Sequence, residues 1–438
     1  MKRRLRRPFL LIALMAVAAI AGICLILSDR SSPDIVRQTA DCNTCVSINE
    51  WLTNDLCRHE GTHPLDRYIE RFMQRWEIKG GSLAVMKEGK LIYAKGYGWA
   101  DEQAGIRTDA HHIFRIASLS KLITATAIMK MAEDSLLRLD EPVFGPEGIL
   151  NQPQFSNLRD KRMTKITVEH LLRHQGGFTN SRGDLLFTTR EIMIREKLDT
   201  VPDMDRVIEY ALSLRLGYTP GHSSRYSNIG YLILSKIIET RSGTSYENYC
   251  QEAILKPAGC LDMHLAKNRY EDRYPNEVRY YESHDATPIP AYDNSGDSLY
   301  RSYGGNNTEG LYGAGGWVSS PAEFLRLVAC IDDDPTVPDL LSQASIHKMM
   351  ERPNGASPIG WAYGSLEGNW IRTGTLAGSS AIVKKQQDGT TWVFITNTSS
   401  WKGSRFPRYI ESMFRTGSSR VKSWPEKDLF ELTSAAHH

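Results

Sequence analysis

A serine and a lysine three residues apart, Ser118 and Lys121, open the apolar run SLSKLITATAIMKMA at 118–132. The run predicts a buried helix, and residues three apart share one helix face. A serine hydroxyl becomes a nucleophile beside a base, and lysine serves as that base when burial or a cationic neighbour lowers its pKa. Alone, the pair is more typical of a serine that caps a core helix and a lysine that reaches solvent.

A tyrosine and an asparagine two residues apart, Tyr226 and Asn228, follow a Pro-Gly turn in TPGHSSRYSNIGYLIL at 219–234. A tyrosine held near a lysine ammonium can exchange a proton with a reacting group, and the asparagine can orient a substrate amide. The alternative interpretation is that Tyr226 packs its ring while Asn228 caps the helix that begins there.

A third polar group lies on an expected strand, IRTGTLAGSSAIV at 371–383. Arg372 supplies a fixed positive charge, Thr373 a hydroxyl, and Gly374 lets a ligand backbone approach the strand closely. An edge strand of this kind can donate a backbone N–H to an oxyanion, here that of Thr375. Alone, the segment is only a strand interrupted by glycine.

Together the three segments follow one order: Ser-x-x-Lys, Tyr-x-Asn and a basic-Thr-Gly strand near the C-terminus. This resembles the serine β-lactamase and penicillin-binding protein superfamily, in particular its class C β-lactamase, DD-peptidase and esterase branch. The resemblance covers about residues 64–415, and three more segments carry it. They are GYGWADEQAGIRTDAHHIFRIASLSK at 96–121, VEHLLRHQGGF at 168–178 and LYGAGGWVSSPAEFLRLV at 311–328.

The resemblance implies a role for each motif residue. Ser118 would be the acylated nucleophile with Lys121 as its partner, and Tyr226 the general base and acid. Asn228 would contact the substrate amide, and the N–H groups of Ser118 and Thr375 would form the oxyanion hole. The resemblance implies neither cofactor nor catalytic metal.

The sequence departs from the family pattern at Arg372, where the family usually has lysine or histidine. Arginine keeps the positive charge but does not release a proton, so a relay role is in doubt. Its planar fork suits a carboxylate, which keeps a carboxylate-bearing substrate or acyl group plausible. The departure weakens the specific prediction of β-lactamase activity.

The elements that must position these residues come from both ends of the chain. We expect a helix at 64–76, a hairpin at 82–98 around Glu88-Gly89, three strands within 361–397 and a last helix at 406–414. A long, mostly helical middle separates them. This predicts an α+β, β-lactamase/transpeptidase-like fold with an antiparallel sheet from both chain ends, flanked by helices, and a helical lobe inserted at about 120–310. The catalytic domain would span 63–415, with a tail at 416–438 and the site at the seam between the lobes.

The N-terminus predicts export. A basic cluster precedes the apolar run 9–27, which is just long enough to cross a bilayer. We expect 1–27 to be an uncleaved anchor rather than a cleaved signal, 28–62 to be a cysteine-containing stalk, and the body to lie in the periplasm or cell envelope. The cluster comprises Lys2, Arg3, Arg4, Arg6 and Arg7.

The chain has seven cysteines, an odd number, so at least one thiol is unpaired. Cys250 and Cys260 are ten residues apart and suitable for a disulfide, whereas Cys330 in an apolar stretch is expected to be a buried thiol. A further group has the residue types of a zinc site: Cys42, Cys45, Cys57 and His59. It lacks the second closely spaced pair of ligands that such sites have, so we expect its cysteines to form disulfides instead.

The remaining polar clusters do not indicate a further functional site. With 53 basic and 51 acidic residues, the net charge of +2 gives no reason to expect a nucleic-acid partner. We expect His170 and His174 to serve packing rather than metal binding. His111-His112 and the acidic run 332–334 are expected at the surface, and 304–307 in a flexible loop near the cleft.

The predicted function is acyl transfer through Ser118. Our first choice is a hydrolase of esters or D-amino-acid peptides, and the second an acyltransferase that passes the acyl group to an alcohol. A β-lactamase is third. A membrane sensor that stays acylated is a distant fourth, because only eight residues precede the apolar run. The partners expected are a small acyl donor, an alcohol acceptor for the second choice, and the membrane through residues 9–27.

Overall fold

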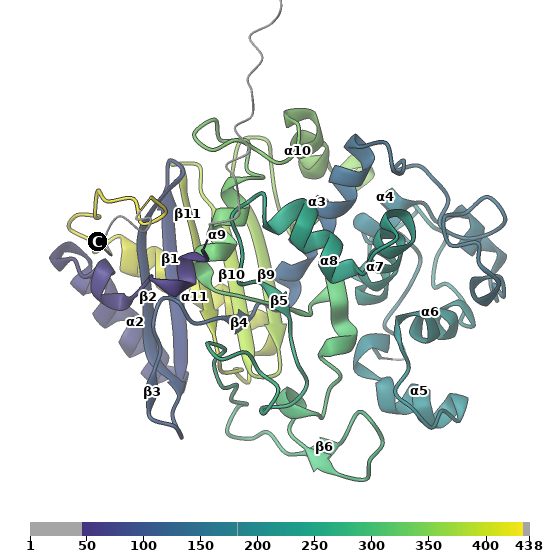
Figure 1. Cartoon of the computed structure of the whole chain (residues 1–438), viewed down its shortest axis with the longest axis horizontal. Coiled ribbons are helices and arrows are strands. Elements are labelled where there is room, and N and C mark those ends of the chain that lie inside the picture. Colours follow the sequence, from purple (N-terminus) through teal and green to yellow (C-terminus); the bar gives the residue numbers. More distant parts are fainter. Residues whose placement is uncertain (1–45, 182, 432–438) are drawn as a thin grey trace, which may run out of the picture. The chain divides into compact units, whose positions relative to one another are not determined.

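The two ends of the chain form one antiparallel sheet of six strands in the order β3-β2-β1-β11-β10-β9 (Figure 1). The computed structural model describes residues 46–181 and 183–431. Strand β1 pairs directly with β11, so that Gly81 lies opposite Thr396. The predicted α+β architecture is confirmed. The strands of this sheet are β1 (Gly80–Lys87), β2 (Lys90–Asp101), β3 (Ile106–Arg107), β9 (Trp370–Leu376), β10 (Ser379–Lys385) and β11 (Thr390–Thr396).

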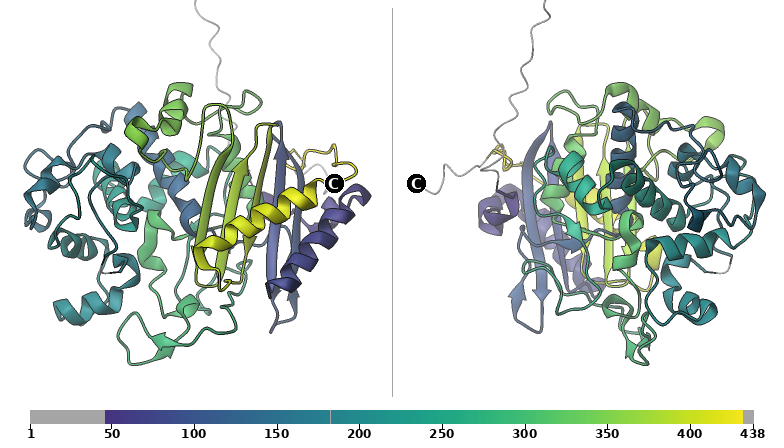
Figure 2. Two further views of the ribbon diagram at one scale, coloured as in Figure 1. Left: turned by 180° about the vertical axis from the view of Figure 1, so that it is seen from behind. Right: turned by 45° about the vertical axis from the view of Figure 1, so that its right-hand side comes forward.

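Both faces of the sheet are covered, because its strands carry apolar side chains on alternate sides. Leu83 and Val85 of β1 join a core with helices α2 (His63–Arg75) and α11 (Phe406–Ser418), whereas Ala84 and Met86 join the main core on the other face. The two terminal helices lie side by side across the back of the sheet (Figure 2). Their contact includes Phe72 stacked on Phe406 with ring centroids 5.8 Å apart.

The inserted lobe is helical in its first part only. Helices follow one another up to residue 250, and residues 256–310 then run mostly as loops with short strands (Figure 1). The lobe helices are α3 (Ser120–Glu133), α4 (Val168–Leu172), α5 (Thr189–Glu196), α6 (Met204–Leu212), α7 (Asn228–Ser242) and α8 (Tyr246–Cys250). The remaining helices are α9 (Pro321–Ala329) and α10 (Gln343–Met350). Two small sheets complete the fold. One consists of β4 (Phe114–Arg115), β8 (Trp317–Ser319) and β5 (His264–Leu265), and the other of β6 (Ile289–Pro290) and β7 (Ser298–Leu299).

Residues 46–62, which the sequence places in a stalk, pack on the globular body. Ile48, Leu52 and Cys57 are buried in the main core. At the other end, the segment after α11 also docks, because the Leu429 N–H donates to the Leu91 carbonyl at 2.8 Å and the Leu429 side chain is buried. The apolar residues scattered through both segments are the reason that they fold onto the body.

Part of the N-terminal prediction lies outside the described residues. This holds for the membrane segment 9–27, for Cys42 and Cys45, for the stalk residues 28–45 and for residues 432–438. Within 46–181 and 183–431, no helix is both long enough and apolar enough to cross a membrane.

The predicted disulfide between Cys250 and Cys260 is wrong. Both are free, buried thiols, and Cys260 Sγ lies 3.1 Å from the Glu323 carbonyl oxygen, to which it donates. Cys57 is a free thiol in the core, and burial raises its pKa to about 11. The prediction that Cys330 is a buried thiol is confirmed.

Two charged clusters that were expected at the surface are partly buried. His112 is buried, and its Nδ1 accepts a hydrogen bond from the Asp109 N–H at 3.0 Å. Asp332 is also buried and forms an ion pair with Lys385 at 3.0 Å. Each polar group finds a partner inside the fold, which offsets the cost of its burial.

Glu323 on α9 joins the N-terminal segment to the body, and its replacement should destabilise the fold. Its buried carboxylate accepts from Ser47 Oγ at 2.6 Å, from the Leu261 N–H at 3.0 Å and from the Asp262 N–H at 3.0 Å. Glu323→Ala leaves these donors without a partner, so the free energy of unfolding should fall by about 2–4 kcal/mol in urea titrations.

The control for Glu323→Ala is Glu70→Ala on the exposed face of α2. It should change the free energy of unfolding by less than about 0.5 kcal/mol. An equal loss of unfolding free energy in the two variants would contradict the role of Glu323 in holding the N-terminal segment to the body.

Candidate active site

Ser118 lies in a short 3₁₀ helix, η5 (Ala117–Leu119), directly before α3. The predicted helix therefore begins two residues later than expected, and Lys121 is its second residue. Ala117 has φ of +49°, a left-handed conformation that a side chain disfavours. Strain of this kind persists where the surrounding structure holds it, and here it sets the backbone of the serine.

Lys121 is fully buried, so the alternative of a lysine that reaches solvent is wrong. Its Nζ donates to Asn228 Oδ1 at 2.7 Å, to the Ala314 carbonyl, and to Ser118 Oγ at 3.4 Å. Burial, together with the charge of Arg372, lowers the pKa of Lys121 to about 8. The side chain can therefore lose its proton near neutral pH.

Tyr226 is the group nearest to the serine hydroxyl. Its Oη lies 2.6 Å from Ser118 Oγ, whereas Lys121 Nζ lies 3.4 Å from it. Desolvation of the hydroxyl acts to raise the pKa of Tyr226, although the residue as a whole is half-exposed, but the positive charges of Lys121 and Arg372 outweigh it and lower that pKa. The helix cap that the alternative interpretation assigned to Asn228 is made by Ser227, whose Oγ accepts from the Gly230 N–H at 3.2 Å.

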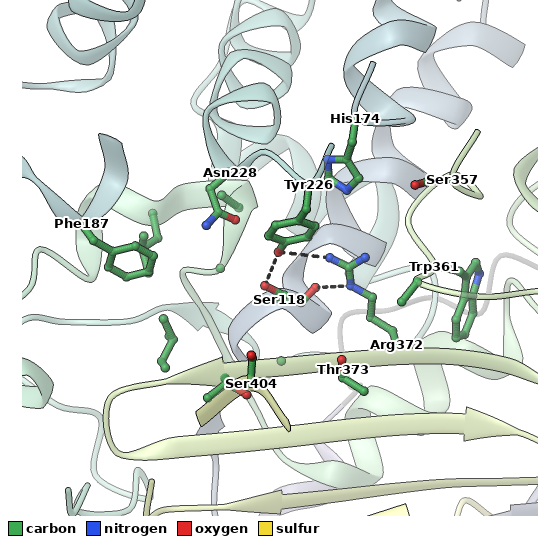
Figure 3. Close-up of a pocket in the computed structure, with 17 residues that line it drawn as sticks. Ser118, His174, Phe187, Tyr226, Asn228, Ser357, Trp361, Arg372, Thr373 and Ser404 are labelled. Atoms are coloured by element: carbon green, nitrogen blue, oxygen red, sulfur yellow. Dashed lines mark hydrogen bonds between the residues drawn. The ribbon is translucent and has the colours of Figure 1, made fainter. Parts of the chain in front are cut away.

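Arg372 is buried and reaches from β9 to the other two motifs (Figure 3). Its Nε donates to the Ser118 carbonyl at 2.9 Å, and its Nη2 donates to Tyr226 Oη at 3.4 Å. No carboxylate forms an ion pair with it in the part of the chain that the structure describes. Its charge is therefore available to the cavity.

Strand β9 lies at the edge of the sheet, as predicted. The backbone of Ile371 bonds to residues 362–363 on the side away from β10. Because backbone groups alternate sides along a strand, the N–H groups of Thr373 and Thr375 face that side too. A Cβ on Gly374 would stand 2.8 Å from the Ser118 nitrogen, so only glycine lets the strand come this close.

These residues line one cavity of about 320 Å³, into which the sequence-predicted site converges (Figure 3). All the predicted site residues except Lys121 line it, and Lys121 lies behind Ser118, Tyr226 and Asn228. The further lining includes Phe187, Leu311 and Trp361, and Figure 3 shows Phe187 and Trp361 on opposite sides of Ser118.

Two residues of the site were missed by sequence reasoning. Asp184 Oδ2 accepts from Asn228 Nδ2 at 2.7 Å, which turns Asn228 Oδ1 toward Lys121. Asp184 also accepts from the Leu186 N–H at 3.1 Å and so caps the 3₁₀ helix η8 (Leu185–Phe187). It lies 44 residues before Asn228 in an irregular segment, and no motif marks it.

His174 lines the cavity instead of serving packing alone. Its ring lies 4.7 Å from that of Tyr226, and its Nδ1 accepts from the Ser227 N–H at 3.3 Å. Burial, with the charges of Arg372 and Lys121, holds the pKa of His174 well below its usual value, so the ring is neutral. His170 is structural as predicted, because its Nδ1 accepts from the Thr167 N–H at the start of α4. The described residues hold no cluster of three or more metal-ligating side chains.

Comparison with known proteins places this constellation in a family. The family model described as Beta-lactamase matches residues 65–410. The chain belongs to the beta-lactamase family. The protein flp of Staphylococcus aureus strain COL is 27% identical over 238 residues, 54% of this chain and 44% of that protein, so the chain spans less than half of it. The putative penicillin-binding protein PbpX of Bacillus subtilis is 24% identical over 72% of this chain and 69% of its own length.

Solved structures of the family share the fold. The octameric penicillin-binding protein homologue from Pyrococcus abyssi has a TM-score of 0.60 and 25% identity, over 83% of this chain and 78% of that chain. The D-amino acid amidase from Ochrobactrum anthropi SV3, complexed with L-phenylalanine amide, has a TM-score of 0.64 and 19% identity, over 83% and 99%. The predicted β-lactamase/transpeptidase-like fold is thereby confirmed.

Asp184→Asn should slow the chemistry of Ser118 and move its pH dependence. A single amide oxygen does not serve both Leu186 and Asn228, so labelling of Ser118 by a fluorophosphonate should slow by about ten-fold to a hundred-fold. In the wild type the labelling rate should fall above pH about 8, where Lys121 loses its proton and no longer stabilises the Tyr226 anion. The variant should show this fall at lower pH, because the negative charge of Asp184 helps Lys121 to keep its proton.

The matched control is Asp160→Asn, which removes a capping carboxylate far from the site. Asp160 accepts from the Arg162 N–H at 3.1 Å, as Asp184 does from Leu186. It should leave the rate and its pH dependence unchanged. An unmoved pH dependence in Asp184→Asn would restrict Asp184 to capping η8.

Proposed function

We propose that the chain is a serine hydrolase that acts on small ester or amide substrates through an acyl-enzyme at Ser118. The observation that carries the proposal is the 2.6 Å contact of Ser118 Oγ with Tyr226 Oη, where the charges of Lys121 and Arg372 outweigh the desolvation of the hydroxyl and lower the pKa of this tyrosine. A serine with a base at hydrogen-bond distance is what covalent acyl transfer requires. Membership of the beta-lactamase family supports the same chemistry.

In the first step, Ser118 Oγ attacks the carbonyl carbon and its proton passes to Tyr226 Oη. Lys121 and Arg372 stabilise the charge that the tyrosine carries before it takes the proton. The oxyanion accepts from the N–H groups of Ser118 and Thr375. The bond to the leaving group then breaks, and Tyr226 returns the proton to the departing nitrogen or oxygen.

In the second step, a nucleophile removes the acyl group. Water gives hydrolysis: it attacks the ester carbonyl, Tyr226 takes its proton, and Ser118 Oγ regains a proton as the acid leaves. An alcohol at the same place would give a new ester and make the enzyme an acyltransferase. The steps are otherwise identical, so the identity of the nucleophile decides between the two activities.

Amides of D-amino acids are the substrate class that we favour. A D-amino acid amidase shares the fold over most of this chain. Arg372 has no ion-pair partner among the residues that the structure describes, so a D-amino-acid peptide whose leaving group carries a free carboxylate is accommodated as well. β-Lactam turnover is expected to be weaker than amide turnover, because Arg372 does not release a proton.

The test compares the full-length chain in detergent with its Ser118→Ala variant. Substrates are D-alanine p-nitroanilide, p-nitrophenyl butyrate and nitrocefin, each with and without added glycerol as an alcohol acceptor. Ser118→Ala should lower kcat/KM by at least about 10³-fold on the best substrate. The control is Ser156→Ala, an exposed serine far from the motifs, which should be fully active.

Full turnover in Ser118→Ala would contradict the proposed nucleophile. Formation of an acylated glycerol in excess of free acid would instead identify the protein as an acyltransferase. Nitrocefin as the best substrate would identify it as a β-lactamase. Stable acylation without release would support the sensor.

We propose that the body is exported and anchored by residues 9–27, on the basis of the basic cluster and the apolar run that follows it. The chain expressed in a Gram-negative bacterium should sediment with the membranes and be cut by protease in spheroplasts. A chain that lacks residues 1–30 should stay in the cytoplasm. Protease resistance of the full-length chain in spheroplasts would exclude export.

A further inference from the structure

A second hollow, of about 310 Å³, lies beside the catalytic cavity. Both are walled by the 3₁₀ helices η8 and η11 (Glu309–Ala314). Phe187 and Leu311 face the catalytic cavity, whereas their neighbours Leu186 and Tyr312 face the second hollow. The start of α6 closes the hollow with the apolar side chains of Met204 and Val207.

The floor of the hollow is a fixed polar network around Asn268, whose side chain is only 4% exposed. Its amide donates to Tyr292 Oη at 2.8 Å and to Asn307 Oδ1 at 3.1 Å. Its Oδ1 accepts from the N–H groups of Thr308 and Glu309. The segment that was predicted as a flexible loop at 304–307 is largely buried and supplies this floor.

Two residues that line the hollow, Asn307 and Tyr292, each keep a hydrogen-bond donor without an acceptor among the described residues. The Asn307 side chain is only 7% exposed, and its Oδ1 accepts from Asn268 and from the Gly310 N–H, which fixes the orientation of the amide. Asn307 lines the hollow, and its Nδ2 has no acceptor among the described residues. Tyr292 Oη already accepts from Asn268, so its own hydrogen remains to be donated. A donor that has no acceptor within the protein can bind the oxygen of a ligand.

The charges around the hollow favour a cation. Asp203 and Glu309 line it, and neither has an ion-pair partner in the described part of the chain. No lysine, arginine or histidine is among the described residues that line it. A ligand that fits carries neutral oxygen acceptors for the two donors and an ammonium group for the carboxylates.

We propose that this hollow binds the ammonium-bearing end of an extended acyl donor, such as a short peptide whose far end is cut at Ser118. The inference rests on the proposed function and adds a second binding site to it. A peptide carbonyl accepts from Asn307 Nδ2 and Tyr292 Oη, and the terminal ammonium faces Glu309 and Asp203. Met204 and Val207 of α6 contact the side chain of the peptide.

Tyr312 connects the two cavities. Its backbone, with φ of 40° and ψ of −129°, is in a strained conformation, and its ring lines the hollow. Ala314, two residues on, supplies the carbonyl that accepts from Lys121. A ligand in the hollow would therefore contact the same short segment whose Ala314 carbonyl accepts from Lys121.

The test measures KM for D-alanine p-nitroanilide and for the same anilide extended by one and by two glycines. Asn307→Asp keeps the acceptor toward Asn268 and Gly310 but replaces the free donor with an oxygen. It should raise the KM of the better extended substrate at least ten-fold and change that of D-alanine p-nitroanilide less than two-fold. Glu309→Gln should raise the KM of the extended substrate but not that of its N-acetyl form.

Binding gives a readout that needs no turnover. The full-length Ser118→Ala chain should bind glycyl-glycyl-D-alanine in isothermal titration, and Ser118→Ala/Asn307→Asp should bind it at least ten-fold more weakly. Equal binding by the two chains, no binding by either, or equal KM changes for short and extended substrates would overturn the proposal. If the two chains differ in binding as expected but no substrate is turned over by the wild type, only the proposed function is contradicted.

Discussion

The burial of one lysine charge organises the catalytic half of this molecule. Lys121 has no exposed surface and meets oxygen atoms from three separate parts of the chain: Ser118 before α3, Asn228 at the start of α7 and Ala314 in η11. An ammonium group taken out of water must find such partners or lose its proton. The segments that supply them are therefore held in one arrangement, and the same arrangement lowers the pKa of the lysine. The contacts of Lys121 thus determine both how these segments pack and the pKa of the lysine.

The residues that meet at the cavity were predictable from the sequence because they come in short motifs. Ser118, Tyr226 and Arg372 are each recognisable from their neighbours, and the sheet follows from alternating strands at the two chain ends. Burial and partners across the fold were not predictable in this way. Asp184 meets Asn228 only because an irregular segment folds back over α7, and nothing local marks that contact.

The errors have the same origin. The spacing of Cys250 and Cys260 suits a disulfide, but each thiol is packed separately in the core. Asp332 lies in an acidic run and is therefore expected at the surface, but it is buried against Lys385 of β10. A single sequence shows the type of each residue but not which distant side chain will neutralise it. Contacts between β10 and the residues that follow α9, or between α7 and η8, depend on packing that emerges only in the complete fold.

The pairing of β1 with β11 bears on how the protein is made. The central strands of the sheet come from residues 80–87 and 390–396, so the first strand to be synthesised waits for one of the last. Loop closure over such a separation is slow, and the apolar faces of β1 and β2 stay uncovered in the meantime. The sheet cannot close until residues 390–396 have been synthesised. Until then the first strands stay unpaired with β11, and the chain is still open enough to pass through a narrow channel.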